Sequence, residues 1–163
     1  MRKIIIISTV FLLMGTTKVL SQYEGTFCMG AHAGYAKEIN SMGVGFHFHY
    51  FYTNSIRFAP SYTYYVPVKG RNMWEIDMDT HYVIPINWEF SFYPIAGLHY
   101  SSWKYESKEY DADNWSKQRP GLNLGAGFQY DLRYKVRTGL EMKYQVMRDF
   151  SQLNIMLSIG FWI

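Results

Sequence analysis

Ionisable side chains recur at every second position along two segments of the chain. Residues 74–84 and 134–146 carry them in this spacing, as Glu75, Asp77, Asp79, Lys135, Arg137, Glu141 and Lys143. Side chains two positions apart lie on the same face of a β-strand, so each segment would bring its charges to one side. Carboxylates and cations gathered in this way can pair, exchange protons or bind a metal ion.

Histidine adds possible metal ligands to the same faces. The five histidines are His32, His47, His49, His81 and His99, and the alternation assigns all of them to the inside of a barrel. His32 and His47 are expected to lie opposite each other in the first hairpin, where they could bind zinc or nickel together with Asp77 or Asp79. A polar interior is also the ordinary place for a histidine. We therefore predict no metal site and no cofactor.

The other face of each segment carries no charge, which is typical of strands that span a membrane. Lipid accepts only apolar side chains on the outside of such strands, whereas a narrow interior holds paired polar groups. The 15 Tyr, 11 Phe and 5 Trp exceed what a core of this size needs and suit a lipid-facing surface with aromatic girdles. No apolar run of helical length follows the N-terminal segment, so a helical membrane protein is excluded. The net charge of +3 is spread out, which argues against nucleic acid as a partner.

The N-terminal segment has the pattern of a signal peptide. Arg2 and Lys3 precede a short apolar run, residues 4–14, and small side chains at Val19 and Ser21 predict cleavage before Gln22. Residues 1–21 are thus expected to be the signal and residues 22–163 one barrel domain. A lipoprotein is disfavoured because Phe27 precedes the single cysteine, Cys28, where a small residue is required.

Turn signals divide the rest of the chain into eight strands of an all-β, antiparallel, up-and-down transmembrane barrel. The predicted strands are 27–36, 42–52, 56–66, 73–84, 88–101, 121–131, 134–146 and 151–162. Tight turns are expected at one end and longer loops at the other, namely 37–41, 67–72, 102–120 and 147–150. Pro60 and Pro94 would each remove a backbone donor and mark a bulge.

The interior of this barrel is predicted to be plugged by ion pairs. Nine glycines point inward and make room for long side chains, because an eight-stranded barrel has space only for side chains. The predicted polar network comprises Arg57, Glu75, Asp77, Asp79, Glu89, Lys135, Arg137, Glu141 and Lys143. Buried charges must pair, so the cations are expected to reach the carboxylates.

Three stretches of the chain resemble the small OmpA/OmpX-type outer-membrane β-barrels, especially the porin-like barrel proteins of Bacteroidetes-type bacteria. They are the Gly-rich strand 29–34, the hairpin segments 121–130 and 137–144, and the ending 158–163. The resemblance implies the bacterial outer membrane as location, with its lipid and lipopolysaccharide as surroundings. It also implies that the outer-membrane insertion machinery reads the C-terminal segment, although Ile163 stands where an aromatic residue is usual.

Two features suggest more specific activities. His99 and Ser101 are vaguely similar to the His-x-Ser of lipid A deacylases, with Glu106 and Glu109 nearby, but Ser102 replaces the Asn of that motif and His99 is expected to face inward. The loop 102–120 presents Tyr105, Tyr110 and Trp115 among balanced charges, which suits contact with a surface ligand. We predict no catalytic residues and a structural or surface-interaction role. The alternatives are a weak solute channel, a lipid A-modifying enzyme and a soluble lipocalin-like barrel.

Overall fold

The described part of the chain consists of strands and tight turns. The computed structural model describes residues 24–68, 71–105, 115–132 and 135–163. Its strands are β1 (Phe27–Ala36), β2 (Ser41–Phe51), β3 (Ile56–Val68), β4 (Arg71–Tyr82), β5 (Ile84–Pro85), β6 (Phe90–Tyr105), β7 (Trp115–Leu132), β8 (Val136–Met147) and β9 (Phe150–Trp162). Within these ranges, no helix has the length and apolar character needed to cross a bilayer. The expected signal peptide, residues 1–21, lies outside the described residues.

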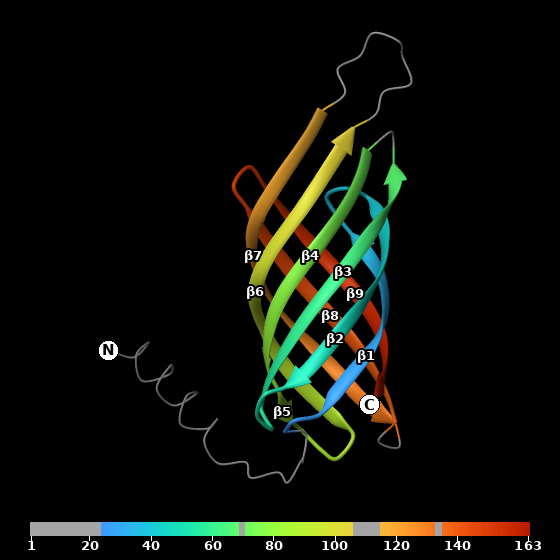
Figure 1. Cartoon of the computed structure of the whole chain (residues 1–163), viewed down its shortest axis with the longest axis vertical. Helices are drawn as coiled ribbons and strands as arrows, with labels where there is room; N and C mark the ends of the chain where they lie inside the picture. Colours follow the sequence, from blue (N-terminus) through green and yellow to red (C-terminus); the bar gives the residue numbers. More distant parts are fainter. Residues whose placement is uncertain (1–23, 69–70, 106–114, 133–134) are drawn as a thin grey trace, which may run out of the picture.

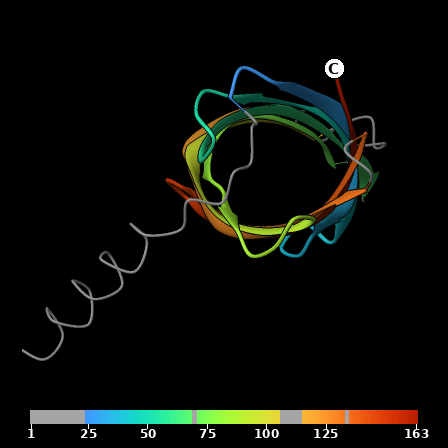
Figure 2. The ribbon, with the colours of Figure 1, turned by 90° about the horizontal axis from the view of Figure 1, so that it is seen from below.

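The sheet closes on itself and forms a barrel (Figures 1 and 2). Each strand pairs antiparallel with its sequence neighbour, β1 pairs with β9, and β4 pairs with β6. β5 follows β4 after a one-residue break at Val83 and continues the same register against β6, so the wall has eight strands. Closure leaves no unpaired edge. The prediction of an eight-stranded antiparallel up-and-down barrel is confirmed.

The strands extend further than predicted at one end, which we call the hairpin end. β6 and β7 pair as far as Tyr105 opposite Trp115, so most of the expected loop 102–120 is a strand hairpin that projects beyond its neighbours (Figure 1). The expected longer loops 67–72 and 147–150 are also shorter than predicted, because only two residues separate β3 from β4 and β8 from β9. The loop prediction was wrong here because extended pairing satisfies backbone donors and acceptors that a loop would leave to water. The opposite end, where β1 begins and β9 ends, is called the terminal end.

The two prolines inside strands do not shift the register. β2 and β3 lack ladder pairs beside Pro60, yet His47 opposite Ser61 and Tyr50 opposite Phe58 belong to one register. The β6–β7 register is likewise unbroken through Pro94. The predicted bulges are therefore wrong, and the irregularity of this wall lies between Tyr65 and Val68 instead. A missing donor removes a hydrogen bond without requiring an extra residue.

Buried charged side chains lie on the inner face of the barrel, whereas the outer face is mainly apolar. Large apolar side chains are exposed around the whole wall, including Phe46, Met78, Leu98, Leu124, Met142 and Leu157. The interior instead holds buried charged and amide side chains. An exterior of this kind would aggregate in water and is the surface that a membrane-spanning barrel presents to lipid.

Two apolar clusters lie inside the barrel and flank the polar residues. Ala36, Tyr65, Met73, Trp103 and Met156 form one cluster toward the hairpin end. Phe51, Val83, Tyr93 and Ile95, with Trp162 packed against them, form the other toward the terminal end. The polar interior is thus enclosed along the barrel axis as well as around it.

Candidate functional site

The centre of the interior is an ion-paired group formed by Lys143 of β8 and two aspartates of β4. The Lys143 ammonium donates to Asp77 at 2.6 Å and to Asp79 at 3.0 Å. The remaining oxygen of Asp77 lies 2.7 Å from Nδ1 of His99, and Asn123 donates to the remaining oxygen of Asp79 at 2.8 Å. All four carboxylate oxygens therefore have a partner, which a charge buried this deeply requires.

Hydroxyl and amide side chains surround Glu75 in a layer that adjoins this group toward the hairpin end. The Tyr65 hydroxyl donates to Glu75 at 2.8 Å and accepts from Asn154 at 2.9 Å. Gln145 donates to the second Glu75 oxygen at 3.3 Å and accepts from Gln152 at 2.9 Å. These contacts join β3, β4, β8 and β9 across the barrel, so the interior side chains link opposite walls.

The backbone of β6 packs closely against Asp79, and Gly97 allows this contact. A Cβ atom added at Gly97 would lie 2.1 Å from Oδ1 of Asp79 and 2.6 Å from the Met78 carbonyl oxygen. Glycine, which has no Cβ atom, is therefore the residue that fits where β6 passes Asp79.

A second ion pair lies near the terminal end. Arg137 donates to both oxygens of Asp131, at 2.7 and 2.9 Å. Its guanidinium also lies 4.1 Å from the ring centroid of Trp162 and 5.2 Å from that of Phe51. A bidentate pair held between aromatic rings is a strong and directional contact.

Arg57 connects this end with the histidines. It donates to Gln129 Oε1 at 2.6 Å, and both Nε and Nη2 lie within hydrogen-bond distance of Nδ1 of His81, at 3.1 and 2.6 Å. The guanidinium carbon lies 4.5 Å from the ring centroid of Tyr93. Since arginine only donates, Nδ1 of His81 acts as the acceptor.

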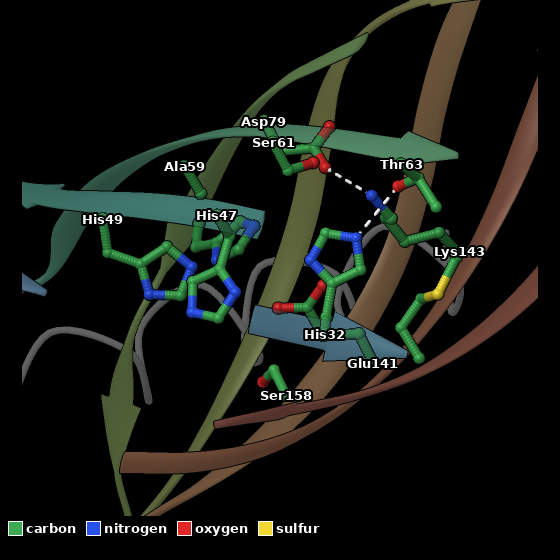
Figure 3. Close-up of a pocket in the computed structure, with 12 residues that line it drawn as sticks. His32, His47, His49, Ala59, Ser61, Thr63, Asp79, Glu141, Lys143 and Ser158 are labelled. Carbon is green, nitrogen blue, oxygen red and sulfur yellow. Dashed lines mark hydrogen bonds and ion pairs between the residues drawn. The ribbon is translucent and has the colours of Figure 1, made fainter. Parts of the chain in front are cut away.

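Four of the histidines, namely His32, His47, His49 and His81, line a small cavity between the Lys143 group and Arg57 (Figure 3). Neighbouring rings stack or tilt against each other, with centroids 5.8 Å apart for His32 and His47, 4.5 Å for His47 and His49, and 5.8 Å for His49 and His81. His32 hydrogen-bonds to the Thr63 hydroxyl at 2.9 Å. Glu141 borders the same cavity and accepts a hydrogen bond from Tyr93 at 2.8 Å.

The structure brings together seven of the nine residues predicted for the polar network. Glu89 and Lys135 are exposed at turns of the terminal end, so their assignment to the interior was wrong. Glu89 there accepts a hydrogen bond from the outward-facing Tyr130. Both residues lie just beyond a strand end, where the alternation of faces no longer applies.

The partners of the cations also differ from the prediction. Arg137 pairs with Asp131, the last residue of the predicted strand 121–131 and not part of the predicted network, and Arg57 pairs with neutral side chains. Sequence analysis missed the interior amides, namely Asn123, Gln129, Gln145, Gln152 and Asn154. Their alternation along the strands predicts that they face inward, but the predicted network included only charged residues.

The residues suggested for catalysis and metal binding are held in other contacts. His99 bonds to Asp77, while Ser101 accepts from Trp103 at 3.0 Å, and both side chains are buried inside the barrel. Glu106 and Glu109 lie outside the described residues. His32 stands opposite Gly45, and His47 opposite Gly30, so these two histidines are offset by two positions and are not directly opposite.

At the hairpin end, the rim carries a few structured cation contacts. Arg119 lies over Trp103 and Phe150, with its guanidinium carbon 4.6 and 5.1 Å from their ring centroids. Lys117 pairs with Asp149 at 2.8 Å, and this hydrogen bond holds the pKa of the Asp149 carboxyl below its usual range. Of the predicted surface residues, Tyr110 and the side chains of Tyr105 and Trp115 lie outside the described part.

Comparison with known proteins identifies the fold. No family model matches the chain, and no curated protein matches it. Among solved structures, the N-terminal β-barrel domain of Pseudomonas aeruginosa OprF has a TM-score of 0.76 at 19% identity and covers 87% of this chain and 100% of that chain. Ail, the attachment invasion locus protein of Yersinia pestis, has a TM-score of 0.64 at 19% identity, covering 86% and 99%. Neisserial surface protein A has a TM-score of 0.67 at 15% identity, covering 85% and 97%.

These similarities agree with the barrel described above. The chain has the fold of the small OmpA/OmpX-like outer-membrane β-barrels, as the sequence resemblance implied. Its apolar exterior is the surface that associates with membrane lipid, and its polar residues lie inside.

Proposed function

We propose that this protein is an integral outer-membrane barrel with a plugged interior that acts as a rigid scaffold for a surface hairpin, and that it has no enzymatic activity. The observation that carries the proposal is the cross-linked interior. Lys143, Asp77 and Asp79 join β4 to β8, and the apolar clusters enclose them on both sides along the axis. Breaking such buried pairs to open a path is costly.

Conductance across planar bilayers tests the plugged interior. The purified chain is expected to show no steady conductance, with a barrel of known pore-forming activity as the positive control. Folding is confirmed by different migration of heated and unheated samples in detergent gels. A steady, ohmic conductance from the heat-modifiable species would contradict the plug and favour the weak-channel alternative.

The projecting β6–β7 hairpin supports a surface-contact role. β7 pairs with β8 only from Gly121 onward, so the backbone of residues 115–120 is paired with β6 alone, and the β6–β7 hairpin extends beyond β8 (Figure 1). Lys104 and Lys117 are exposed on this hairpin. Ail, a protein with a similar fold, is described as an attachment invasion protein and has been solved with a heparin analogue. We infer that the hairpin contacts a ligand or cell surface outside the membrane.

Shortening the hairpin tests this role without disturbing the barrel. Residues 104–116 would be replaced by a two-residue type I′ turn, which suits a β-hairpin and keeps Trp103 in its apolar cluster, paired with Lys117. The shortened protein is expected to keep its heat-modifiable migration but lose binding to host or neighbouring cells and to sulfated polysaccharide. Unchanged binding would show that the hairpin is not the contact surface.

The proposal also covers insertion into the outer membrane and contact with its lipopolysaccharide. Outward apolar residues alternate along β9, as at Leu157, Ile159 and Phe161, which supports recognition of this strand by the outer-membrane insertion machinery. Exposed cations at the hairpin end, including Arg71 and Arg148, suit lipopolysaccharide phosphates. A lipid A deacylase is disfavoured because His99 and Ser101 are buried away from lipid, and unchanged lipid A acyl chains in mass spectra would agree with this.

A further inference from the structure

The interior contains more carboxyl groups than arginine and lysine side chains. Among the described residues it contains five carboxylates, Glu75, Asp77, Asp79, Asp131 and Glu141, and three permanent cations, Arg57, Arg137 and Lys143. If all of them ionise, two negative charges remain uncompensated in a region without bulk water. One divalent cation would balance this excess, whereas unpaired buried charge is strongly unfavourable.

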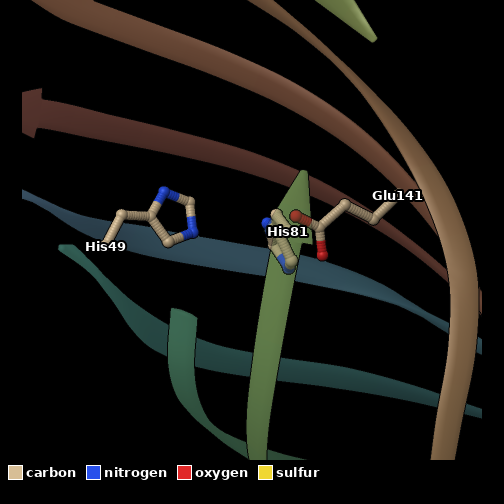
Figure 4. A group of neighbouring side chains, drawn as sticks. All are labelled: His49, His81 and Glu141. Atoms are coloured by element: carbon tan, nitrogen blue, oxygen red, sulfur yellow. The ribbon is translucent and has the colours of Figure 1, made fainter. Parts of the chain in front are cut away.

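Three metal-ligating side chains converge at one place in this interior. His49 of β2, His81 of β4 and Glu141 of β8 each offer a ligand atom, and these atoms all lie within 4.8 Å of one another (Figure 4). Ligands at metal distances of about 2.0–2.2 Å would lie closer together, so each side chain would move by about 1 Å. The three residues come from well-separated walls of the barrel, so barrel closure creates the group.

The histidines in this group have unused binding capacity. Nδ1 of His49 and Nε2 of His81 have no hydrogen-bond partner among the described residues, although the two side chains are only 4% and 1% exposed. Buried polar atoms are nearly always satisfied, and leaving one unsatisfied costs about 1–3 kcal/mol. The cavity beside them has a volume of about 20 Å³, which holds one occupant the size of a water molecule or a metal ion.

The surroundings of Glu141 and His49 suit a metal site. Tyr93 donates to one oxygen of Glu141 and so orients the carboxylate, while the other oxygen can face the metal. His47 lies beside His49, with ring centroids 4.5 Å apart, but is not one of the three converging residues, so a water molecule in the cavity would supply the fourth ligand. We propose that His49, His81 and Glu141 bind one divalent transition-metal ion of the imidazole-preferring class, such as zinc.

Arg57 competes with metal binding, because it is hydrogen-bonded to one of the proposed ligands, His81. While Arg57 donates to Nδ1 of His81, the neutral ring carries its hydrogen on Nε2, the atom that would face the metal. Binding therefore moves this hydrogen to Nδ1 and releases the arginine, which keeps Gln129 and Tyr93 as partners. Because apolar clusters enclose the interior at both ends, the metal is expected to enter during folding and exchange slowly afterwards.

The experiment refolds the full chain, without a histidine tag, from urea into detergent in the presence or absence of zinc. Free metal is then removed with a chelator and gel filtration, and bound zinc is measured by mass spectrometry. We expect one zinc per chain after refolding with zinc. His49→Gln and His81→Gln should each lower retained zinc at least tenfold, with heat-modifiable migration confirming that each variant folds.

Two further variants distinguish this site from other outcomes. His32→Gln changes a histidine of the same cavity outside the ligand group and should retain zinc like the wild type. Arg57→Gln removes the opposing charge and supplies an acceptor for Nδ1–H of His81, so zinc affinity should rise about tenfold or more. Cobalt in place of zinc should give intense visible absorption, typical of a four-coordinate site, in the wild type but not in His81→Gln.

The proposal is overturned if the wild type retains no more zinc than His81→Gln. It is also overturned if His32→Gln loses zinc as fully as His49→Gln, which would place the ion at the other end of the cavity. Weaker zinc binding by a folded Arg57→Gln barrel would show that Arg57 supports the site and does not compete with it.

Discussion

Two levels of the barrel interior contain similar side chains but differ in whether their carboxylates are ion-paired and in where their unpartnered atoms lie. At the level of Asp77, both oxygens of each aspartate are paired, with Lys143 between them. At the level of His81, two imidazole nitrogens have no partner among the described residues and border a cavity. His99 Nε2 and Asn123 Oδ1 at the first level also have no partner among the described residues, but they do not line the cavity. The comparison indicates that the first level stabilises the barrel through its ion pairs, whereas the second brings unpartnered imidazole nitrogens and a carboxylate together at one cavity.

The largest effect is expected from Lys143→Met. This change leaves Asp77 and Asp79 buried without their cation and should destabilise the barrel by about 3–5 kcal/mol. Urea unfolding in lipid vesicles measures the difference. In the matched control, Lys143→Met is combined with Asp77→Asn and Asp79→Asn, and this triple variant should recover most of the loss. If the single variant is as stable as the wild type, the ion-paired level does not hold the walls together.

An intermediate effect is expected from Tyr65→Phe. The variant keeps the ring in its apolar cluster but removes the hydroxyl that joins Glu75 to Asn154. Leaving the Glu75 oxygen without its donor should cost about 1–3 kcal/mol in the same unfolding measurement. Phe92→Tyr, which adds a hydroxyl on the outward face, serves as a control for changes in ring polarity.

A smaller effect is expected from His49→Phe in metal-free buffer. Nδ1 of His49 has no partner among the described residues, so the exchange for an apolar ring of similar shape should cost less than about 1.5 kcal/mol. The comparison between the two levels would fail if this variant were destabilised as much as Lys143→Met.

The smallest effect concerns the exposed Lys117–Asp149 pair. Since Lys117 lowers the pKa of Asp149 in the folded state, the pair stabilises the fold above the ordinary carboxyl pKa. This contribution is lost as the pH falls through the lowered value. The difference in unfolding free energy between the wild type and Lys117→Met should therefore be small near neutral pH, because both side chains are about half exposed, and should vanish in acid. A difference that persists in strong acid would contradict this assignment.

Much of the fold followed from sequence alternation because the physical constraint is strict. Residues such as Leu140 and Met142 must face lipid, and a slip of one position would expose Glu141 and Lys143 instead. Strand ends were less predictable. Glu89 and Lys135 obey the alternation formally, yet they lie at turns where no second wall faces them. The length of the β6–β7 hairpin could not be predicted, because its charged and aromatic residues give no sign that the strand pairing continues.

The candidate site was predictable in type but not in partners. Parity placed Arg57, Asp77, Arg137 and Lys143 inside, but the stagger of neighbouring strands decides which residues share a level. Arg137 therefore meets Asp131, while Glu141 lies near His49 and His81. Asp131 and Arg137 are six residues apart and face each other across the β7–β8 hairpin, whereas Glu141 is far in sequence from His49 and His81, and those separations give no sign of contact.

The sequence by itself determined that one face of each strand meets lipid and the other forms a polar interior, because side-chain direction repeats every two residues and charge cannot face lipid. Only the tertiary structure decided which polar groups meet, since barrel closure and register set the height of each residue along the axis. That geometry gives every oxygen of Asp77 and Asp79 a partner and leaves His49 and His81 at a common cavity, each with one nitrogen that has no partner in the described part of the chain.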